Sequence, residues 1–89
     1  MQVVLDGREM INKTRAHLYL GHKLNMPDYY GRNLDALWDI LTTYNRSIKI
    51  SLINKEDLLA YLGDYGSSII KLLKDVDEEN NNIEIEIEN

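Results

Sequence analysis

The stretch that decides the fold is MPDYYGRNLDALWD, residues 26–39. Pro27 biases Met26 away from helix, and Asn33 is a favoured N-cap, so a helix is predicted to begin directly after Asn33. The apolar positions of this helix follow the spacing i, i+3, i+4, i+7 of a core-facing stripe, and they are Leu34, Leu37, Trp38 and Leu41. The stretch therefore predicts a loop that leads into an amphipathic helix.

An acidic strip runs beside this apolar stripe. Asp35, Asp39 and Thr42 share it, and the two carboxylates stand at i and i+4. Like charges at this spacing cost a few tenths of a kcal/mol, and no Lys or Arg of the helix relieves them. We therefore predict that this strip meets a cationic partner.

The loop before the helix carries paired aromatic residues. Gly31 is expected to take a backbone angle that other residues avoid, and Tyr29 and Tyr30 precede the cap. Tyrosine offers a large rigid contact area with one polar tip, which favours a recognition surface. The alternative is that one of the two tyrosines belongs to the core.

This stretch resembles the signature of the barstar-type ribonuclease inhibitors. That signature reads proline, an acidic residue, two tyrosines, glycine, any residue, and then Asn-Leu-Asp-Ala-Leu-Trp-Asp. The match is sharpest over residues 26–42 and remains compatible in length and element order elsewhere. The resemblance implies a cytoplasmic, monomeric protein that plugs the active site of a small basic extracellular-type ribonuclease in a 1:1 complex.

The resemblance also implies roles for individual residues. Asp39 would mimic the RNA phosphate, with Asp35 and Asp75 in flanking ion pairs; Asp75 stands where the family usually has the longer glutamate. Trp38 could instead pack mainly in the core, and Tyr44, where tryptophan is common, could shield the helix end. The residues expected to bind the partner are Tyr29, Gly31, Asn33, Leu34, Asp35, Trp38, Asp39, Thr42, Tyr44 and Asp75.

Asp75 belongs to an acidic run at the end of the last predicted helix. Asp77, Glu78 and Glu79 follow it, and a helix C-terminus disfavours negative charge. A solvated helix end that aids solubility is the simpler interpretation of such a run. A field that attracts a basic partner is the other.

Composition sets independent bounds. The chain has 89 residues, enough for one domain, and no cysteine for disulfides or thiolate metal sites. It has no apolar run near 18 residues and no charged-then-apolar leader, which argues against membrane insertion and secretion. Fifteen acidic against ten basic residues give a net charge of -5, which disfavours nucleic acid and favours basic proteins.

The remaining pattern predicts an α/β fold, a small three-stranded parallel sheet packed with about four helices. The expected strands are residues 2–5, 48–53 and 83–88, the last with isoleucines on one face and glutamates on the other. The other helices are expected over 14–24, from an Asn54 cap to Gly63, and after Gly66-Ser67-Ser68.

The acidic strip is also typical of two other classes of function, metal-dependent catalysis and binding of a different basic protein. A metal-dependent phosphodiesterase using Asp35 and Asp39 lacks the Lys, Arg or His that phosphate chemistry usually adds, and no cofactor motif is present. His17 and His22, five apart on one helix, point in different directions, which argues against a zinc site. An acidic interaction module for a basic protein other than a ribonuclease stays open.

Overall fold

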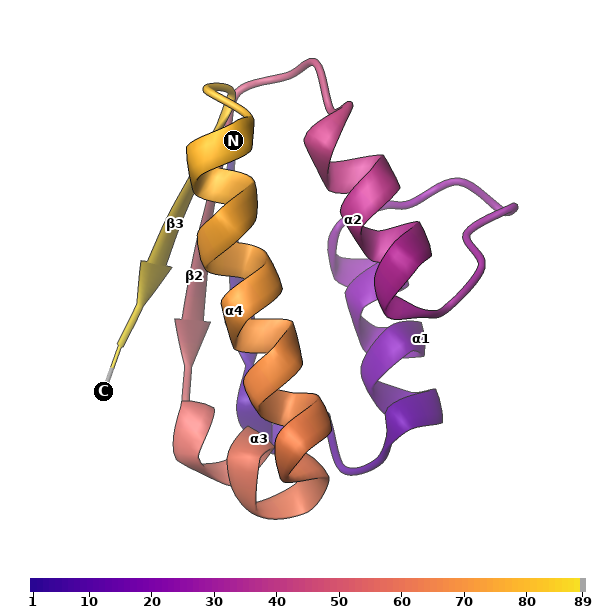
Figure 1. Ribbon diagram of the computed structural model, residues 1–89, viewed down its shortest axis with the longest axis vertical. Coiled ribbons are helices and arrows are strands. Elements are labelled where there is room, and N and C mark those ends of the chain that lie inside the picture. Colours follow the sequence, from indigo (N-terminus) through magenta and orange to yellow (C-terminus); the bar gives the residue numbers. More distant parts are fainter. Residues whose placement is uncertain (89) are drawn as a thin grey trace.

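A three-stranded parallel sheet runs through the structure, a computed structural model that describes residues 1–88. Its strands are β1 (Gln2–Asp6), β2 (Ile48–Ile53) and β3 (Ile83–Ile87), in the spatial order β1-β2-β3 (Figure 1). Parallel neighbours require long crossovers, which the helical segments between the strands provide. The predicted parallel sheet is confirmed.

The two faces of the sheet differ because side chains alternate along each strand. In the pairing register, Ile50 lies between Val3 and Ile85, on the face that the helices bury. On the opposite face Lys49 reaches across to β3 and forms an ion pair of 3.0 Å with Glu86. The expected division of β3 into an isoleucine face and a glutamate face is thus confirmed.

Four α-helices complete the fold of the described residues. They are α1 (Lys13–Lys23), α2 (Leu34–Thr42), α3 (Lys55–Leu62) and α4 (Asp64–Glu79), and a short 3-10 turn η1 (Gly7–Glu9) follows β1. In Figure 1, α4 crosses in front of the sheet, and α1 and α2 are drawn to its right. The chain follows the predicted order βααβααβ.

The core draws on nearly every element. Fully buried side chains from the strands, helices and connecting turns meet there, and they include Leu5, Met10, Leu20, Leu37, Ile50, Leu58, Ile69 and Leu73. Burying a Leu or Ile side chain contributes roughly 1.5–3 kcal/mol. The apolar stripe of α2 is therefore anchored in the main core, which fixes the orientation of the acidic strip beside it.

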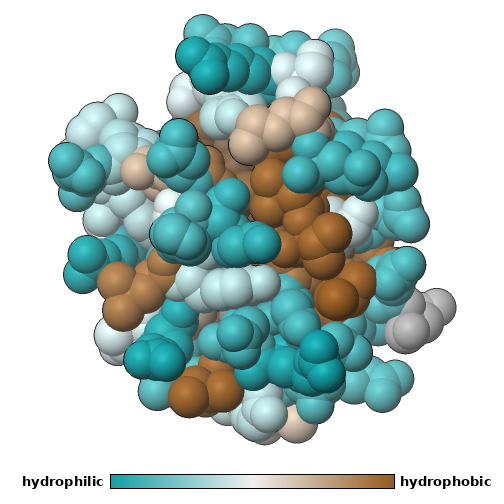
Figure 2. Space-filling model, turned by 180° about the vertical axis from the view of Figure 1, so that it is seen from behind, coloured by the Kyte–Doolittle hydropathy of each residue, from teal (hydrophilic) through white to brown (hydrophobic). Residues whose placement is uncertain are grey.

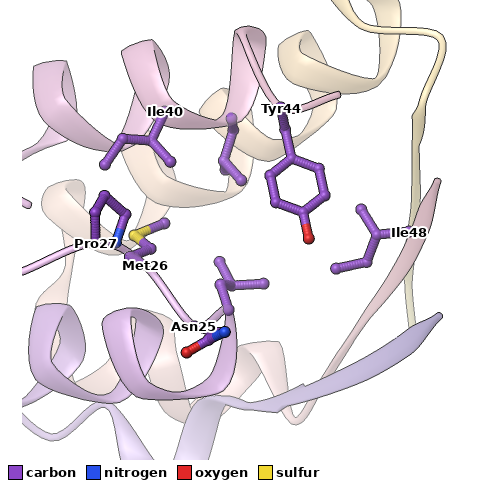
Figure 3. A pocket seen from close by; sticks show the side chains of 8 residues that line it. Asn25, Met26, Pro27, Ile40, Tyr44 and Ile48 are labelled. Atoms are coloured by element: carbon purple, nitrogen blue, oxygen red, sulfur yellow. The ribbon is translucent and has the colours of Figure 1, made fainter. Parts of the chain in front are cut away.

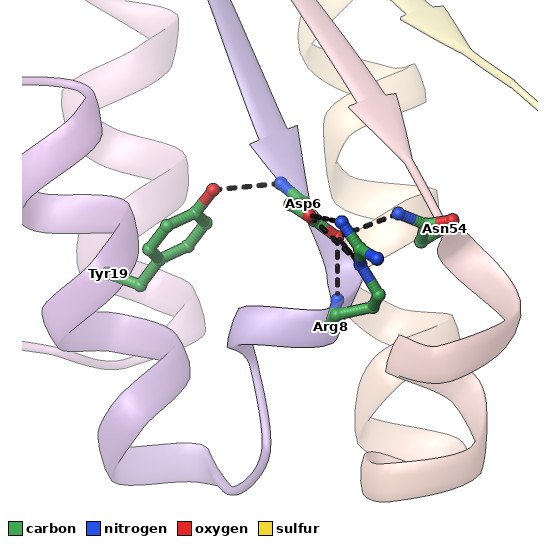
Figure 4. Close-up of polar contacts among 4 residues, drawn as sticks. All are labelled: Asp6, Arg8, Tyr19 and Asn54. Carbon is green, nitrogen blue, oxygen red and sulfur yellow. Dashed lines mark hydrogen bonds and ion pairs between the residues drawn. The ribbon is translucent and has the colours of Figure 1, made fainter.

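Asn54 is the N-cap residue of α3 as expected, but the capping hydrogen bond of its side chain is absent. Asn54 precedes α3 in the left-handed conformation, with φ of 56°, and its side chain makes no cap hydrogen bond. Its side-chain amide instead donates to the Asp6 carboxylate at 2.9 Å, next to Arg8 (Figure 4). A tertiary contact between the ends of β1 and β2 thus replaces the local cap.

The expected start of the last helix is wrong. Gly63 ends α3 as predicted, but α4 begins directly at Asp64, so Gly66, Ser67 and Ser68 lie inside it. Gly66 is buried, and a Cβ there would lie 3.0 Å from the Leu58 carbonyl oxygen. The glycine that resembles a turn in the sequence instead allows α3 and α4 to pack closely.

The surface is mainly hydrophilic with local apolar areas. Seen from behind, the largest group of hydrophobic residues forms a patch right of the centre that is bordered by hydrophilic residues, and smaller groups lie at the lower left and bottom (Figure 2). Met1 and Val4, at the start of the chain, are 71% and 44% exposed. Within residues 1–88, every helix is too short or too polar to cross a membrane.

Candidate partner-binding surface

Asn33 fixes the start of α2. Its side-chain oxygen accepts a 2.7 Å hydrogen bond from the Ala36 amide, and its side-chain nitrogen donates to the Gly31 carbonyl at 3.3 Å. The predicted N-cap is confirmed. One side chain therefore ties the first turn of the helix to the loop before it.

The two sides of α2 have different surroundings. Leu37 is fully buried, while Leu34 and Trp38 are half-buried and pack against the core. Asp35 and Asp39 are exposed on the neighbouring strip, as the helical spacing predicts. The helix therefore presents both carboxylates to solvent from a rigid support.

The carboxylates of Asp35 and Asp39 have no internal partner. Among residues 1–88, no hydrogen bond or ion pair engages either side chain. Their four oxygens remain free to accept hydrogen bonds from a ligand. In the free protein, water is therefore the hydrogen-bond partner of both carboxylates.

Thr42, the third member of the strip, is engaged with its own helix. It is half-buried, and its hydroxyl donates to the Trp38 carbonyl at 2.7 Å. Thr43 donates in the same way to the Asp39 carbonyl at 2.7 Å. Both threonine hydroxyls thus bond back to carbonyls of their own helix, close to its C-terminus.

The α1–α2 loop, residues 24–33, contains the two tyrosines. Tyr29 is 83% exposed, whereas Tyr30 is 8% exposed and belongs to the core cluster. The alternative interpretation, that one tyrosine is core, is therefore confirmed for Tyr30. Tyr29 remains available for contact with a partner.

The expected unusual backbone angle of Gly31 is wrong. The left-handed residue is its neighbour Arg32, with φ of 56°. A Cβ at Gly31 would lie 3.3 Å from the Ala36 Cβ, tighter than ordinary contact. Gly31 is needed because the loop passes close to the first turn of α2, and the conformational strain falls on Arg32.

Tyr44 lies just beyond α2 and is held by an asparagine from the end of α4. The buried Asn80 side-chain amide donates to the carbonyls of Leu41 and Tyr44, both at 2.8 Å. The Tyr44 ring is half-buried against the core and lines a small apolar cavity of about 70 Å³ with Met26 and Ile40 (Figure 3). The Tyr44 ring thus packs against the core and is also partly exposed to solvent.

Asp75 differs from the two α2 carboxylates. It is half-buried on α4, and its carboxylate is paired with Lys71 one turn earlier at 2.8 Å. α2 packs against α4, so the acidic strip and Asp75 lie on adjoining helices. A partner's cation would compete with Lys71 for Asp75, whereas Asp35 and Asp39 need no such exchange.

Asp77 has a structural contact that the sequence pattern did not indicate. Its carboxylate accepts a 2.8 Å hydrogen bond from the Ile85 amide on β3. β3 is an edge strand, and this contact covers one of its free amides. Glu78 and Glu79 are exposed, so they are the members of the acidic run that remain in solvent.

The role of His17 was not predicted from the sequence. This residue is 2% exposed, and its ring nitrogens contact the hydroxyls of Tyr30 and Tyr65. Burial lowers the pKa of His17 and raises the pKa of Tyr65. The spacing of His17 with Leu20 and Leu24, at i, i+3 and i+7, places it on the core-facing side of α1 and was the available indication.

Comparisons with known proteins show the family of this chain. The family model described as barstar (barnase inhibitor) matches residues 1–88. A protein of Bacillus subtilis (strain 168) named "Putative ribonuclease inhibitor YrdF" is 39% identical over 79 residues, which cover 88% of this chain and 87% of that protein. The family consists of inhibitors and not of enzymes. The signature over residues 26–42, the three-stranded parallel sheet and the match over nearly the whole chain agree, and the chain belongs to the barstar family.

Proposed function

We propose that the protein inhibits a small basic ribonuclease by inserting the acidic strip of α2 and the adjoining loop into its active site. The observation that supports this is the pair of exposed carboxylates, Asp35 and Asp39, that have no partner within residues 1–88. They stand one turn apart on a capped helix whose other side is buried. Such a surface is preorganised to receive cations.

Electrostatic mimicry explains how occlusion would work. A ribonuclease must hold a phosphodiester with Arg, Lys and His side chains, and carboxylates can satisfy these donors with charge-assisted hydrogen bonds. Asp39 takes the central position of the phosphate, and Asp35 and Asp75 form flanking ion pairs. No bond in the inhibitor is broken, so inhibition is steric and reversible.

Apolar contacts would surround the charged centre. Tyr29 and the exposed edges of Trp38 and Tyr44 supply rigid aromatic area, and Leu34 and Thr42 extend the rim. Gly31 and Asn33 shape the loop that carries Tyr29. One copy of this surface fits one active site, so we infer a 1:1 complex with a monomeric inhibitor in the cytoplasm.

A titration of inhibition tests the proposal. The purified protein, added to several small basic microbial ribonucleases including one from its own organism, should suppress at least one of them at near-stoichiometric ratio. The variant Asp39→Ala should lose this effect, and Glu9→Ala, which removes an exposed acid from η1, should retain it. Failure against every ribonuclease, with capture of a different basic protein from the native cell, would replace inhibition by an interaction module.

A further inference from the structure

A buried chain of three side chains connects α4 with the α1–α2 loop. His17 Nδ1 lies 2.5 Å from the Tyr30 hydroxyl, and His17 Nε2 lies 2.6 Å from the Tyr65 hydroxyl. His17 and Tyr30 are 2% and 8% exposed, whereas Tyr65 is half-buried. The chain therefore runs from the partly exposed Tyr65 inward to the loop.

The donors in this chain can be assigned by accounting for its protons. Burial raises the pKa of both tyrosines and lowers the pKa of His17, so all three groups are neutral near pH 7. A neutral imidazole has one N–H donor and one acceptor nitrogen. Among residues 1–88, His17 Nδ1 is the hydrogen-bond acceptor within reach of the buried Tyr30 hydroxyl. Nδ1 therefore accepts from the Tyr30 hydroxyl, and Nε2–H donates to the Tyr65 hydroxyl.

Tyr30 in turn holds the loop. Its ring packs against α1 so closely that a Cβ at Gly21 would lie 3.4 Å from it, and its amide donates to the Pro27 carbonyl at 3.0 Å. Its neighbours in the chain are the exposed Tyr29 and Gly31, which is tied to the Asn33 cap. The position of the Tyr30 hydroxyl therefore affects the conformation of residues 28–33.

We propose that Tyr65 is a positioning residue for the ribonuclease-binding loop and acts through His17 and Tyr30. Its hydroxyl accepts from Nε2, keeps the proton on that nitrogen and leaves Nδ1 free to hold Tyr30. Without this acceptor, the imidazole proton can move to Nδ1, where it would oppose the Tyr30 O–H. The role in binding rests on the proposed function, but the hold on the loop does not.

The variant Tyr65→Phe removes the hydroxyl and keeps the ring, over which the Lys13 ammonium lies at 4.6 Å. Tyr61→Phe is the matched control, because Tyr61 is 48% exposed on α3. Tyr19→Phe is a second control, since it removes a hydroxyl on α1 that accepts from the Asp6 amide at the end of β1 and is not bonded to the loop. Tyr30→Phe removes the other hydroxyl and so breaks the hydrogen bond between His17 and the loop.

Three measurements on these variants test the inference. Nitrogen NMR gives the His17 tautomer, hydrogen exchange gives the opening of amides 28–33, and inhibition of a responsive ribonuclease gives affinity. Tyr65→Phe and Tyr30→Phe should speed exchange of these amides by roughly two- to tenfold and weaken inhibition by a similar factor, while the amides of β2 are unchanged. Tyr61→Phe should change nothing, and Tyr19→Phe should lower stability without selective loosening of the loop.

Unchanged loop exchange in Tyr65→Phe, or an equal rise in the amides of β2, would overturn the inference and make Tyr65 a merely structural residue. If the wild-type protein inhibits no ribonuclease, the proposed function fails. The tautomer and the exchange of the free protein still decide whether Tyr65 holds the loop, so the two failures are distinguishable.

Discussion

The side-chain amide of Asn54 donates a 2.9 Å hydrogen bond to the Asp6 carboxylate, so two residues at the ends of neighbouring strands are joined by their side chains. Arg8 completes the cluster, with its guanidinium nitrogen 2.9 Å from the same carboxylate. The Arg8 hydrogen bond, the Asn54 amide and the Arg8 backbone amide together lower the pKa of Asp6 from 3.8 to about 2. This cluster links β1 to β2 before either strand turns into a helical segment.

Asp6→Asn should therefore lower the free energy of unfolding at neutral pH. The native pKa of Asp6 is depressed, so its contribution is present above pH 3.8 and is lost as the pH falls through about 2. We expect a loss of about 1–2 kcal/mol at pH 7, below the full value of the shift because Arg8 is exposed. Urea unfolding of both proteins between pH 6 and pH 2 measures it, and a difference that stays constant over this range would contradict the assignment.

Gly7→Ala should destabilise the same end of the sheet. A Cβ at Gly7 would lie 2.2 Å from the Asn54 carbonyl oxygen, a backbone atom that cannot move away alone. The expected loss is about 3 kcal/mol. Gly21→Ala is the comparison, because Gly21 has a helical backbone in α1 and a Cβ there would meet the Tyr30 ring at an ordinary 3.4 Å, so its effect should stay within about 1 kcal/mol. Equal losses in thermal unfolding would show that steric contact at Gly7 is unimportant.

His17 predicts a second pH dependence, in the mildly acidic range. Burial lowers its native pKa below the ordinary 6.5, so the stability linked to neutral His17 is complete above pH 6.5 and declines as the pH falls through the native pKa. His17 contacts the hydroxyls of Tyr30 and Tyr65, with Lys13 over the Tyr65 ring, and it lines a pocket together with His22, Asp28 and Arg32. Burial is the cause of its lowered pKa.

His17→Gln should remove this part of the pH dependence, and His22→Gln, which changes an exposed histidine on the same helix, should keep it. Unfolding free energies measured from pH 8 to pH 4.5 compare the three proteins. A wild-type slope that survives in His17→Gln would assign the dependence to other groups.

Much of the fold could be predicted because its main determinants are local. The β-branched run 48–53, the alternating strand 83–88 and the Asn33 cap each carry their meaning in spacing and residue type. The errors arose where distant contacts override local preference. Asn54 is a good N-cap by type, yet Asp6, 48 residues away, takes its side chain. Gly66 resembles a turn residue, yet packing against Leu58 keeps it in α4.

The candidate site, like the fold, could be predicted only in part. Helical spacing predicted that Asp35 and Asp39 would be exposed beside a buried stripe, and the structure places them so. The contacts that support the surface could not be predicted, because His17 to Tyr65 and Asn80 to Leu41 join residues far apart in the chain. Their positions depend on how α1, α2 and α4 pack together.

Asp39→Ala should separate binding from folding. It leaves the partner's buried cations unpaired, so affinity for a responsive ribonuclease should fall by about 2–5 kcal/mol. Stability should be unchanged or slightly raised, because the repulsion from Asp35 is relieved and no internal bond of the carboxylate is lost. Titration and differential scanning calorimetry measure the two effects. A fall in stability as large as the fall in affinity would make Asp39 a structural residue.

Ionic strength should act mainly on the rate of association. If the exposed carboxylates on α2 and at the end of α4 steer a basic partner, the on-rate should drop steeply with salt while the off-rate changes less, because screening acts most on charges that are still solvated. Stopped-flow mixing at low and high salt measures both rates.

The structure selects which charges to neutralise in that experiment. Glu78→Gln and Glu79→Gln change exposed residues and should lower the on-rate modestly with little effect on the off-rate. Asp77→Asn is unsuitable as a steering variant, because the Asp77 carboxylate accepts from the Ile85 amide and its loss should reduce stability. Asp57→Asn, on α3, is the control for a carboxylate outside the acidic run. An on-rate indifferent to salt and to the two glutamate substitutions would refute steering and leave shape and the aromatic contacts of Tyr29 and Trp38 as the basis of recognition.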